Sequence, residues 1–595
     1  MSWRTCLWLT AAVLPHTAAA QGAFELDEAF VYSGLLPVEV NRTGASVEIL
    51  EEDDIEDGPI AIDVHLERLP GVTVTTSGAL GGNSVVRIRG LPQRYTGVTF
   101  DGIDISDPSA PQTDFNFGTL TSALTNRIEV AKGSQTTFYG SDAIAGSVNI
   151  TSWRPEKEGL SFETAIEAGS YATISASLSV GYLGDEGEAA LTVASIDTEG
   201  FSSRAGNTEA DGFDQTALSF YVSRELGEAV TLGFSGFYSD SHVEDDDGDA
   251  IPTGDYYEDR KGARIFAKYR GERVDHEISV SKYQVTRLDP TGFSTMFEGG
   301  RERIGYLGTT DLYSNTKLAF GADWTKESSE IDGVFDEASN SAVFGEFQHA
   351  ISDQADLSVS LRHDFHSDFD DATTGRVALA YRVTADTTLK GVVGTGFRAP
   401  SLYERFGPFG SSTLEPEKSK SFELGVEHRT GAAIFSAVAF RNEIDNLIDF
   451  DFGAFAYAQV PGQTTSQGVE LAGEIDIGTM SLFGNYTYSA SENPAGRSLR
   501  VPRHDLTFGI EKSFSDKLSA ALTVRHVADR LDVDGSFATV AAPDFTVAGL
   551  SVSYMINDST EAYVRVENLL DEDYQEVLTF NSPGRSVFVG LRASF

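Results

Sequence analysis

The densest group of side chains with metal-binding chemistry is an acidic run between His242 and Arg260. Its carboxylates are those of Glu244, Asp245, Asp246, Asp247, Asp249, Asp255, Glu258 and Asp259. Crowded carboxylates repel one another unless a hard cation with about six to eight oxygen ligands neutralises them, so calcium is the chemical candidate. An EF-hand is excluded, because the sixth position counted from Asp245 holds no glycine. A solvated acidic loop is the alternative interpretation.

The other reactive side chains do not form a catalytic pattern. Asp101 precedes Gly102 and Ser141 precedes Asp142, but no histidine lies near either pair in the sequence to act as a base. His363 and His366 are separated by two residues, which on a strand places them on opposite faces or across a turn. We interpret them as ordinary surface histidines. We expect that the protein is not an enzyme.

The composition excludes several classes of protein. The chain has 90 acidic and 44 basic residues, a formal net charge of -46, whereas a nucleic-acid-binding protein needs a basic face to replace condensed counterions. The single cysteine is Cys6. Because Cys6 lies in a segment that we expect to be removed, the mature chain has no disulfide, thiolate metal site or cysteine nucleophile.

The first twenty residues have the pattern of a secretory signal peptide. Arg4 is their only charge, an apolar stretch runs from Cys6 to Leu14, and Ala18-Ala19-Ala20 precedes Gln21. The apolar stretch is much shorter than the roughly 20 residues of a spanning helix. We expect the mature chain to begin at Gln21.

From about Gly159 to Phe595 the sequence repeats short stretches of alternating apolar and polar residues, separated by Gly, Asp, Asn and Ser. A period of two predicts strands with one apolar face. About 440 residues of this pattern exceed the roughly 200 to 250 residues of a single soluble β domain, and no stretch approaches the roughly 18 apolar residues of a spanning helix. We therefore predict a transmembrane β-barrel of about 22 antiparallel strands rather than a soluble sandwich.

The last strand carries the most specific local pattern. Val587, Val589, Leu591 and Ala593 alternate with small or polar residues, and the chain ends on Phe595. This pattern resembles the terminal strand by which outer-membrane barrels are recognised for assembly.

Residues 21–155 have a different sequence pattern, with one helical segment among short strands. Ile60 to Leu69 has helical spacing and stops at Pro70-Gly71, a pair that ends helices. Short strands are predicted at Val72 to Thr75, Val85 to Arg89, Val98 to Asp101, Arg127 to Val130 and Ser147 to Thr151. We predict a compact α+β domain before the barrel.

Several sequence motifs in this domain resemble those of a known family. They are Leu66-Glu-Arg-Leu-Pro-Gly-Val72, Arg87-Ile-Arg-Gly90, Phe100-Asp-Gly-Ile103, Arg127-Ile-Glu-Val130 and Tyr139-Gly-Ser-Asp-Ala-Ile-Ala-Gly146. In the barrel they are Gly396-Phe-Arg-Ala-Pro-Ser401, Leu414-Glu-Pro-Glu-Lys-Ser419, Gln467-Gly-Val-Glu-Leu471 and Val566-Glu-Asn-Leu-Leu-Asp571. In order and spacing they resemble TonB-dependent outer-membrane receptors, and among those the cobalamin receptors.

The resemblance implies a domain organisation and a partner. It implies a signal peptide at 1–20, a periplasmic leader at 21–40, a plug domain at 41–155 inside the barrel, and the barrel at 156–595. A TonB-type protein would pull on a short extended segment of the leader, at Glu28-Ala-Phe-Val-Tyr-Ser-Gly34. Phe30, Val31 and Tyr32 could add to that partner as an edge strand. The segment departs from the usual valine-rich form at Tyr32 and Ser33.

The resemblance also implies candidate site residues. Cobalamin receptors order their outer loops with calcium, and the matching ligands here are Glu209, Asp211, Asp245 and Asp259. The transported solute is gripped where plug and loops meet, at two apices, Gly78 to Asn83 and Ile103 to Phe117. The candidate contacts within these apices are Gly81, Asn83, Asp107, Phe115 and Phe117. Turn formation and core packing are the alternative interpretations of each of them. No cofactor is required beyond this possible calcium.

The expected activity is TonB-dependent import of a bulky metal-containing solute, with cobalamin or a related corrinoid first and a ferric siderophore second. Haem is a further alternative, because Phe397-Arg-Ala-Pro400 also occurs in haem receptors, but no histidine lies between this motif and Leu414. A passive porin is the alternative from a different class, although it needs neither plug nor leader. We expect a monomer in the lipid of the outer membrane of a Gram-negative bacterium.

Overall fold

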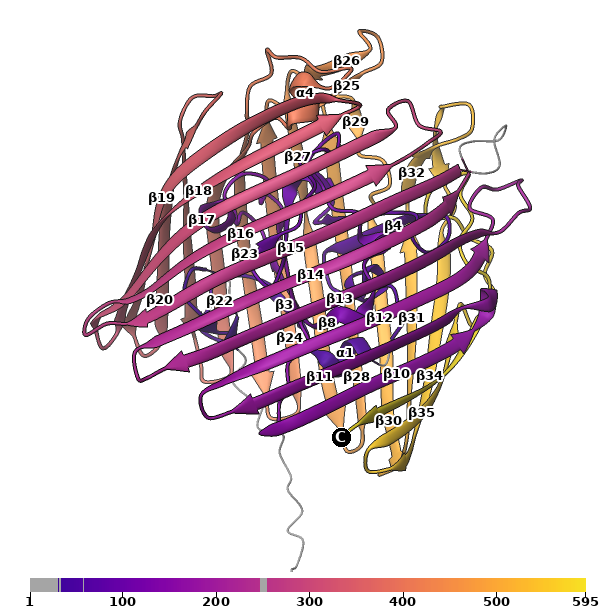
Figure 1. Ribbon diagram of the computed structural model, residues 1–595, viewed down its shortest axis with the longest axis horizontal. Helices are drawn as coiled ribbons and strands as arrows, with labels where there is room; N and C mark the ends of the chain where they lie inside the picture. The colour runs from indigo at the N-terminus through magenta and orange to yellow at the C-terminus, as the bar shows by residue number, and fades with distance from the viewer. Residues whose placement is uncertain (1–29, 32–33, 57, 247–253) are drawn as a thin grey trace, which may run out of the picture.

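The computed structural model describes residues 30–31, 34–56, 58–246 and 254–595. The predicted signal peptide lies outside the described residues. Two architectures make up the described chain: a wide closed β-barrel and, inside it, a small α+β domain formed by the residues that precede the barrel (Figure 1). Among the described residues, no helix has both the length and the apolar character needed to cross a membrane.

The barrel has 22 antiparallel strands, as the sequence predicted. The strands are β10 (Gly159–Gly169), β11 (Ile174–Gly184), β12 (Gly187–Phe201), β13 (Asp211–Leu226), β14 (Val230–Asp245), β15 (Gly254–Arg270), β16 (Asp275–Leu288), β17 (Met296–Tyr313), β18 (Thr316–Ile331), β19 (Val334–Ser352), β20 (Ala355–His366), β21 (Ala372–Arg382), β22 (Thr387–Arg398), β23 (Glu417–Thr430), β24 (Ala433–Asp445), β27 (Gln463–Ile477), β28 (Met480–Asn493), β30 (His504–Ser515), β31 (Leu518–Ala528), β34 (Phe545–Asn557), β35 (Thr560–Glu567) and β36 (Ser586–Ser594). A two-residue strand, β29 (Gly496–Arg497), extends the pairing of β28.

The first and last strands close the barrel. β10 pairs with β36 from Glu163↔Ser594 to Gly169↔Phe588. The carboxy-terminal Phe595 exchanges both backbone hydrogen bonds with Phe162, at 2.8 and 3.0 Å. No edge is left at this seam, so the strand backbones bond to one another around the wall.

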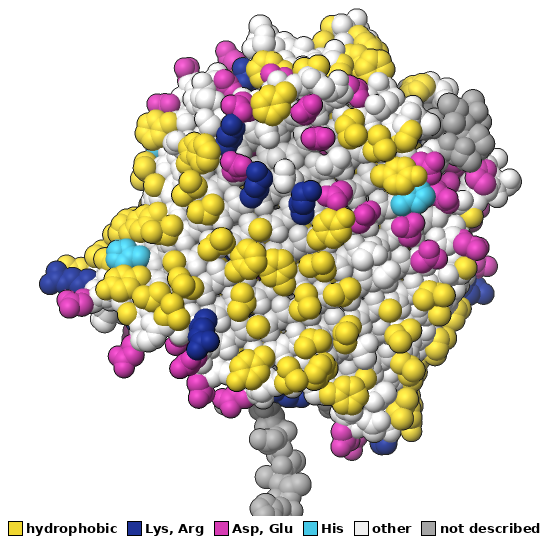
Figure 2. All heavy atoms as spheres, viewed as in Figure 1, with side chains coloured by type: hydrophobic (Ala, Val, Ile, Leu, Met, Phe, Trp, Pro, Cys, Tyr) yellow, Lys and Arg dark blue, Asp and Glu magenta, His cyan; other side chains and the backbone are white. Residues whose placement is uncertain are grey.

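The outer wall is apolar and the inner wall is polar, as the alternation predicted. On β36, Val587, Val589 and Leu591 are exposed on the outside, whereas Ser586 and Phe588 are buried on the inside. Figure 2 shows hydrophobic side chains across the middle of the outer wall, with charged side chains mostly toward the two ends. This distribution fits a wall surrounded by lipid.

The two ends of the barrel differ. At one end, which we call the turn end, consecutive strands are joined by two to four residues. At the other, which we call the loop end, connections reach 18 residues, as between β22 and β23 and between β35 and β36. The loop-end connections contain α4 (Leu402–Phe406) and the hairpins β25 (Ile448–Asp451) with β26 (Ala456–Gln459) and β32 (Arg530–Val533) with β33 (Thr539–Ala542).

The inner domain, which we call the plug, is a five-stranded mixed sheet with a hairpin and short helices. The sheet order is β3-β8-β9-β6-β7, with β6 parallel to β9, and β4 and β5 form the hairpin. The strands and α-helices of the plug are β3 (Val47–Leu50), α1 (Glu52–Glu56), α2 (Ile62–Leu66), β4 (Val72–Ser77), β5 (Asn83–Ile88), β6 (Thr96–Phe100), β7 (Ile103–Asp104), β8 (Thr125–Lys132), α3 (Thr136–Tyr139) and β9 (Gly146–Ser152). In the leader before the plug, β1 (Phe30–Val31) and β2 (Val38–Glu39) form a separate two-stranded sheet.

The predicted helix and strands of the plug are confirmed, with boundaries shifted by a few residues. α2 is shorter than the predicted helix, and Ile62, Leu66 and Leu69 all face the core at no more than 8% exposure. The core continues beyond the plug, since Phe237, Tyr283 and other barrel side chains belong to the same buried cluster. Plug and barrel therefore pack as one unit in this conformation.

Candidate functional site: the interface between plug and barrel and its outer mouth

Four charged side chains join the plug to the barrel wall, and we call them the plug lock: Arg89, Lys132, Glu423 and Glu470. Arg89 Nε lies 2.8 Å from Glu470 Oε1, and Arg89 Nη1 lies 2.5 Å from Glu423 Oε2. Lys132 Nζ lies 3.2 Å from Glu470 Oε2. All four side chains are at most 5% exposed, so removing Arg89 leaves the buried charge of Glu423 without its partner.

The sequence analysis did not predict the plug lock, although two of its residues lie in sequence motifs that were singled out. Arg89 belongs to the phrase Arg87-Ile-Arg-Gly90, and Glu470 belongs to Gln467-Gly-Val-Glu-Leu471. These phrases are about 380 residues apart. Only the three-dimensional packing brings them together.

A second buried network, which we call the outer network, lies between the plug and the loop end. Arg398 Nη2 lies 2.7 Å from Glu404 Oε1, and Arg398 Nη1 lies 3.0 Å from Glu417 Oε2. The Tyr95 hydroxyl of the plug donates to Glu417 at 2.9 Å. Ser401 caps α4 in a capping box with Glu404, which fixes the position of that carboxylate. The motifs Gly396 to Ser401 and Leu414 to Ser419 thus hold an outer connection against the plug.

Two predicted ligand contacts, Phe115 and Phe117, point into the core. They are 2% and 0% exposed, and their ring centroids are 4.9 Å apart in an edge-to-face arrangement. The guanidinium of Arg260 on β15 lies over the Phe115 ring at 4.4 Å. In this conformation neither ring is accessible to a solute, because both are used to pack the plug against the barrel.

The three other predicted contacts are placed differently from one another. Asn83 is exposed at the β4–β5 hairpin. Gly81 is buried with φ +89, and a Cβ there would lie 2.4 Å from the Phe213 ring, so glycine is required. Asp107 is buried and forms an ion pair of 2.7 Å with Arg287 of β16. Of these three, Asn83 has the most accessible side chain.

Asp101 and Ser141, for which the sequence shows no catalytic partner, make structural contacts within the plug and between plug and barrel, respectively. Asp101 accepts hydrogen bonds from Ser152 N at 3.1 Å and Ser152 Oγ at 2.7 Å, tying the end of β6 to β9. Ser141 Oγ accepts from Ala399 N at 3.0 Å. These contacts give both residues a structural role.

Part of the predicted calcium set is brought together at the loop end. Carboxylate oxygens of Glu209, Asp211 and Asp246 all lie within 4.8 Å of one another. Asp246 accepts from Arg204 N at 2.9 Å and from Asn207 Nδ2 at 2.6 Å. Glu209 Oε1 is buried and has no hydrogen-bond partner among the residues that the structure describes.

The structure departs from the predicted set at two positions. Asp246 joins the cluster where Asp245 was expected, a difference of one residue along the acidic run. Asp259 faces the outside of the barrel, because its neighbours Glu258 and Arg260 take the inward positions of β15. The Asp259 carboxylate lies 3.5 Å from the Lys261 ammonium. On a strand, one step in sequence moves a side chain to the opposite face.

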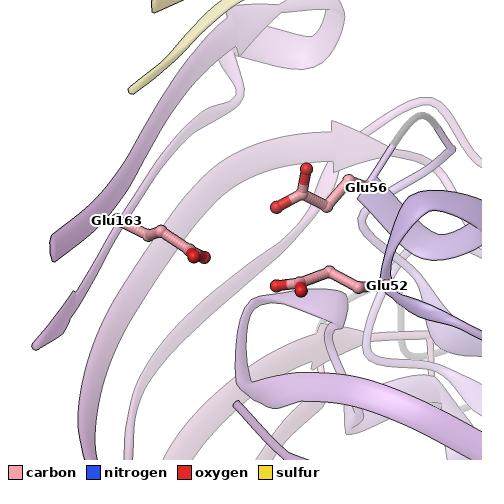
Figure 3. Close-up of side chains that lie close together, drawn as sticks. All are labelled: Glu52, Glu56 and Glu163. Carbon is pink, nitrogen blue, oxygen red and sulfur yellow. The ribbon is translucent and has the colours of Figure 1, made fainter. Parts of the chain in front are cut away.

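A second acidic group lies between the plug and the barrel wall near the closing seam (Figure 3). Glu52 and Glu56 of α1 and Glu163 of β10 have carboxylate oxygens within 4.8 Å of one another. Burial raises the pKa of Glu52 to about 9, and the negative charges of Glu163 and Glu56 act in the same direction. Glu52 therefore keeps its proton at neutral pH, which reduces the repulsion in the group.

A cavity of about 1270 Å³ separates one side of the plug from the wall formed by β24 to β36. It reaches from turn-end connections at 431–432 and 478–479 to Asn568 and Pro583 at the loop end. Acidic residues dominate its charged lining: Asp53, Asp54, Glu56, Asp63, Glu67, Glu474, Asp476, Glu511, Glu561, Glu567 and Glu576. The basic ones are Arg68, Lys512, Arg525, Arg565 and Arg592.

Comparison with protein families identifies this plugged barrel. The family described as "TonB dependent receptor-like, beta-barrel" matches residues 152–569, and the "TonB-dependent Receptor Plug Domain" matches residues 39–147. The chain belongs to the TonB-dependent receptor family. The family consists of receptors that transport small molecules, not of enzymes, and its members interact with TonB.

Individual relatives fall into two groups. The receptor is 26% identical to "Vitamin B12 transporter BtuB" of Vibrio cholerae over 93% of both chains, and to the protein of that name from Photobacterium profundum over 89% of both. Among solved structures it resembles the siderophore receptor PirA from Acinetobacter baumannii, with a TM-score of 0.81, 18% identity and coverage of 92% and 98%. It also resembles the ferric-catecholate import receptor Fiu from E. coli K12, with a TM-score of 0.79, 15% identity and coverage of 95% and 98%. At such identities, the structural matches establish the fold alone.

The predicted coupling segment is only partly described. Phe30–Val31 pair antiparallel with Val38–Glu39. After Gly34, the backbone N–H of Leu35 donates to Glu346 of β19 at 2.7 Å. The remaining residues of the segment, Glu28, Ala29, Tyr32 and Ser33, lie outside the described residues. The leader is thus tied to the wall immediately after the predicted segment.

The plug lock makes a prediction about stability. We expect Arg89→Ala to destabilise the receptor by about 3–5 kcal/mol, because the buried Glu423 carboxylate loses its guanidinium and Glu470 keeps only Lys132. Thermal unfolding and protease sensitivity of the plug measure the effect. The control is Arg224→Ala, which breaks a pair exposed at 67% and 72% and should cost at most about 1 kcal/mol. Equal stability of the two variants would contradict the role of the lock.

Proposed function

We propose that this receptor imports a corrinoid such as cobalamin across the outer membrane of a Gram-negative bacterium. The supporting observation is its similarity to vitamin B12 transporters over 93% of both chains, because matched length restricts differences to substitutions and short loops. The turn end then faces the periplasm and the loop end faces the medium. A monomer suffices for this function, since the barrel closes within one chain.

A ferric siderophore is the second candidate, supported by the folds of solved siderophore receptors. The charge of the receptor favours the corrinoid over one large class of siderophore. A ferric tris-catecholate is a polyanion, whereas cyanocobalamin is neutral. The cavity beside the plug is lined mainly by carboxylates, and the chain has a net charge of -46, so the field of the receptor opposes a polyanion.

Equilibrium binding to the purified receptor tests the choice of ligand. We expect cyanocobalamin to bind more tightly than a ferric tris-catecholate, because its neutral charge is not repelled by the acidic lining. Equilibrium dialysis with absorbance detection measures both. Binding of the ferric complex alone would assign the receptor to siderophores, and binding of neither would reject both candidates.

We further propose that Glu28 to Gly34 is the segment by which a TonB-type partner supplies energy. A plugged barrel blocks passive flow, so work must reach the plug through a contact. An extended segment can pair with a partner strand through its backbone. Its position supports the role, because the chain is next anchored at Leu35, where a pull would be transmitted to the contact with Glu346.

Deletion of residues 28–34 tests this coupling. We expect ligand binding to be unchanged and uptake to be abolished, because the binding elements remain while the connection to the partner is lost. Whole-cell binding and uptake of radiolabelled cyanocobalamin separate the two effects. The matched control deletes the seven preceding residues, 21–27, and should transport normally. Uptake by the 28–34 deletion would contradict the coupling role.

We also propose that calcium binds Glu209, Asp211 and Asp246 and orders the loop end. Hard carboxylate oxygens suit calcium, and the buried Glu209 oxygen, which has no hydrogen-bond partner in the described part of the chain, is available as a ligand. The ion would neutralise three neighbouring carboxylates that otherwise repel one another. It would hold the β12–β13 connection to the end of β14.

Calcium titration during ligand binding tests this site. We expect calcium to tighten the binding of cyanocobalamin and Asp246→Asn to weaken the response, because one charged ligand of the ion is lost. Asp259→Asn is the control, since this carboxylate lies on the outer face of β15. A flat calcium response in the unaltered receptor would leave the cluster as a solvated acidic group, and an equal loss in both variants would contradict the choice of ligands.

A further inference from the structure

We propose that the cavity between the plug and the wall from β24 to β36 is a water-filled path that conducts small cations passively between the two ends of the barrel. This activity is additional to energised import and does not depend on which solute the receptor carries. The extent of the cavity, the charge of its lining and the pairing of its basic side chains support it.

The cavity extends along the height of the barrel, beside the wall that Figure 1 draws from orange to yellow. At the turn end it is lined by residues 431–432, between β23 and β24, and by residues 478–479, between β27 and β28. At the loop end it is lined by Tyr171, in the connection between β10 and β11, and by residues 582–583, before β36. Its volume of about 1270 Å³ is far larger than the roughly 10–15 Å³ that one water molecule needs. A polar cavity of this size holds water along its length.

The barrel side of the cavity is formed by short side chains. Six inward positions of β31 and β34 line it: Ser519, Ala521, Thr523, Gly549, Ser551 and Ser553. Short side chains leave space beside the plug, and their hydroxyl groups can replace part of the hydration shell of an ion.

The lining carries an excess of negative charge. In the described part of the chain, eleven carboxyl groups and five basic side chains line the cavity. Three of the basic side chains, those of Arg525, Arg565 and Arg592, form ion pairs with carboxylates of the protein. The carboxyl groups still outnumber the basic side chains that remain. A negative lining between low-dielectric walls raises the local concentration of cations and excludes anions.

The turn-end mouth of the cavity is acidic on both of its sides. Glu474 and Asp476 occupy successive inward positions at the turn end of β27 and are exposed. Asp53, Asp54 and Glu56 of α1 line the same cavity from the plug. Asp54 is close enough to Glu474 for their charges to interact. The mouth therefore attracts cations from the compartment at the turn end.

One ion pair crosses the cavity and distinguishes small ions from bulky solutes. Glu67, at the end of α2, pairs with Arg525 of β31, so two side chains bridge the plug and the wall. The cavity continues on both sides of this bridge, to Glu474 toward the turn end and to Asn568 toward the loop end. Water and small ions pass around two side chains, whereas a bulky solute is stopped until the plug moves. Passive conduction of cations is thus compatible with energised import of a larger solute.

Current recordings from planar lipid bilayers test the proposal. We expect the purified receptor, without ligand or partner, to conduct potassium at least about fivefold better than chloride, because the acidic lining excludes anions. The reversal potential in a gradient of potassium chloride gives this ratio. No conductance above that of protein-free bilayers would overturn the proposal, and so would equal permeability or a preference for chloride.

A double variant, Glu474→Gln with Asp476→Asn, tests the role of the lining. We expect the ratio of potassium to chloride permeability to fall at least about twofold, because two negative charges are removed from the mouth without a change in size. The matched control is Asp185→Asn with Glu186→Gln, which removes two exposed carboxylates from the turn between β11 and β12, outside the lining. Equal ratios in the two double variants would contradict selection by the cavity.

Gly549→Trp tests whether the cavity is the path. A Cβ at this inward position of β34 would contact only the Val566 carbonyl oxygen, at 3.9 Å, so an indole fits into the cavity without displacing the wall. We expect the conductance to fall at least about fivefold, because an apolar ring narrows and dewets the path. Heat-modifiable migration in electrophoresis confirms that the barrel is folded.

Gly391→Trp is the control for the blocking variant. Gly391 lies on the lipid-facing side of β22, between the exposed Leu389 and Val393, and a Cβ there would contact only Glu423 O, at 3.7 Å. Its conductance should equal that of the unaltered receptor. Equal conductance of Gly549→Trp and Gly391→Trp would place the ion path outside the cavity and overturn the proposal. Cyanocobalamin is absent from these recordings, so their outcome is independent of the proposed function.

Discussion

Hydrogen bonding of the backbone within lipid is the constraint on which the rest of this structure depends. A bilayer offers no water to unpaired N–H and C=O groups, so a strand that crosses it needs a partner on both sides. The pairing of β10 with β36 meets this requirement at the seam. Twenty-two strands then enclose a lumen too wide for the side chains of the wall to fill. The folded plug inside is a consequence of that width.

The inner wall determines how the plug is held. Along each strand the apolar side chains point outward, which leaves mostly polar side chains on the inner wall. The plug is therefore fixed by ion pairs as well as by packing. Arg89 of the plug contacts two barrel glutamates while 1% exposed, and Asp107 of the plug pairs with Arg287 of β16. Buried pairs of this kind specify one arrangement, but they add less stability than their number suggests, since each charge loses its hydration. Ion pairs of this kind give the plug a defined position in the barrel without apolar packing on every side.

The acidic cavity is the counterpart of these contacts. Contacts and open space occur on the same part of the wall: Glu470 of β27 and Arg525 of β31 pair with plug side chains. Between such contacts, the wall from β24 to β36 leaves a space lined by carboxylates. The two ends add a further asymmetry, with the leader anchored at Glu346 of β19 and the acidic cluster of Glu209, Asp211 and Asp246 carried by the loop end.

The sequence alone determined what depends on neighbouring residues. Alternation such as that of Val587 to Phe595 predicted the strands and the outward face, and Pro70-Gly71 predicted that a helix stops before this pair, because periodicity and helix termination are local properties. The sequence motifs of the plug and barrel were sufficient to predict the family. These features needed no knowledge of which strand lies opposite which.

Only the tertiary structure decided which distant side chains meet. Phe115 and Phe117, predicted to face a ligand, are buried because Arg260 and the barrel wall cover them. Asp259, predicted to join Glu209 and Asp211, lies on the outer face instead, because Glu258 and Arg260 take the inward positions of β15 and one residue reverses the face. Arg89 finds Glu423 and Glu470 across more than 330 residues of chain. Such contacts follow from closure and register of the whole barrel, which no short stretch of sequence encodes.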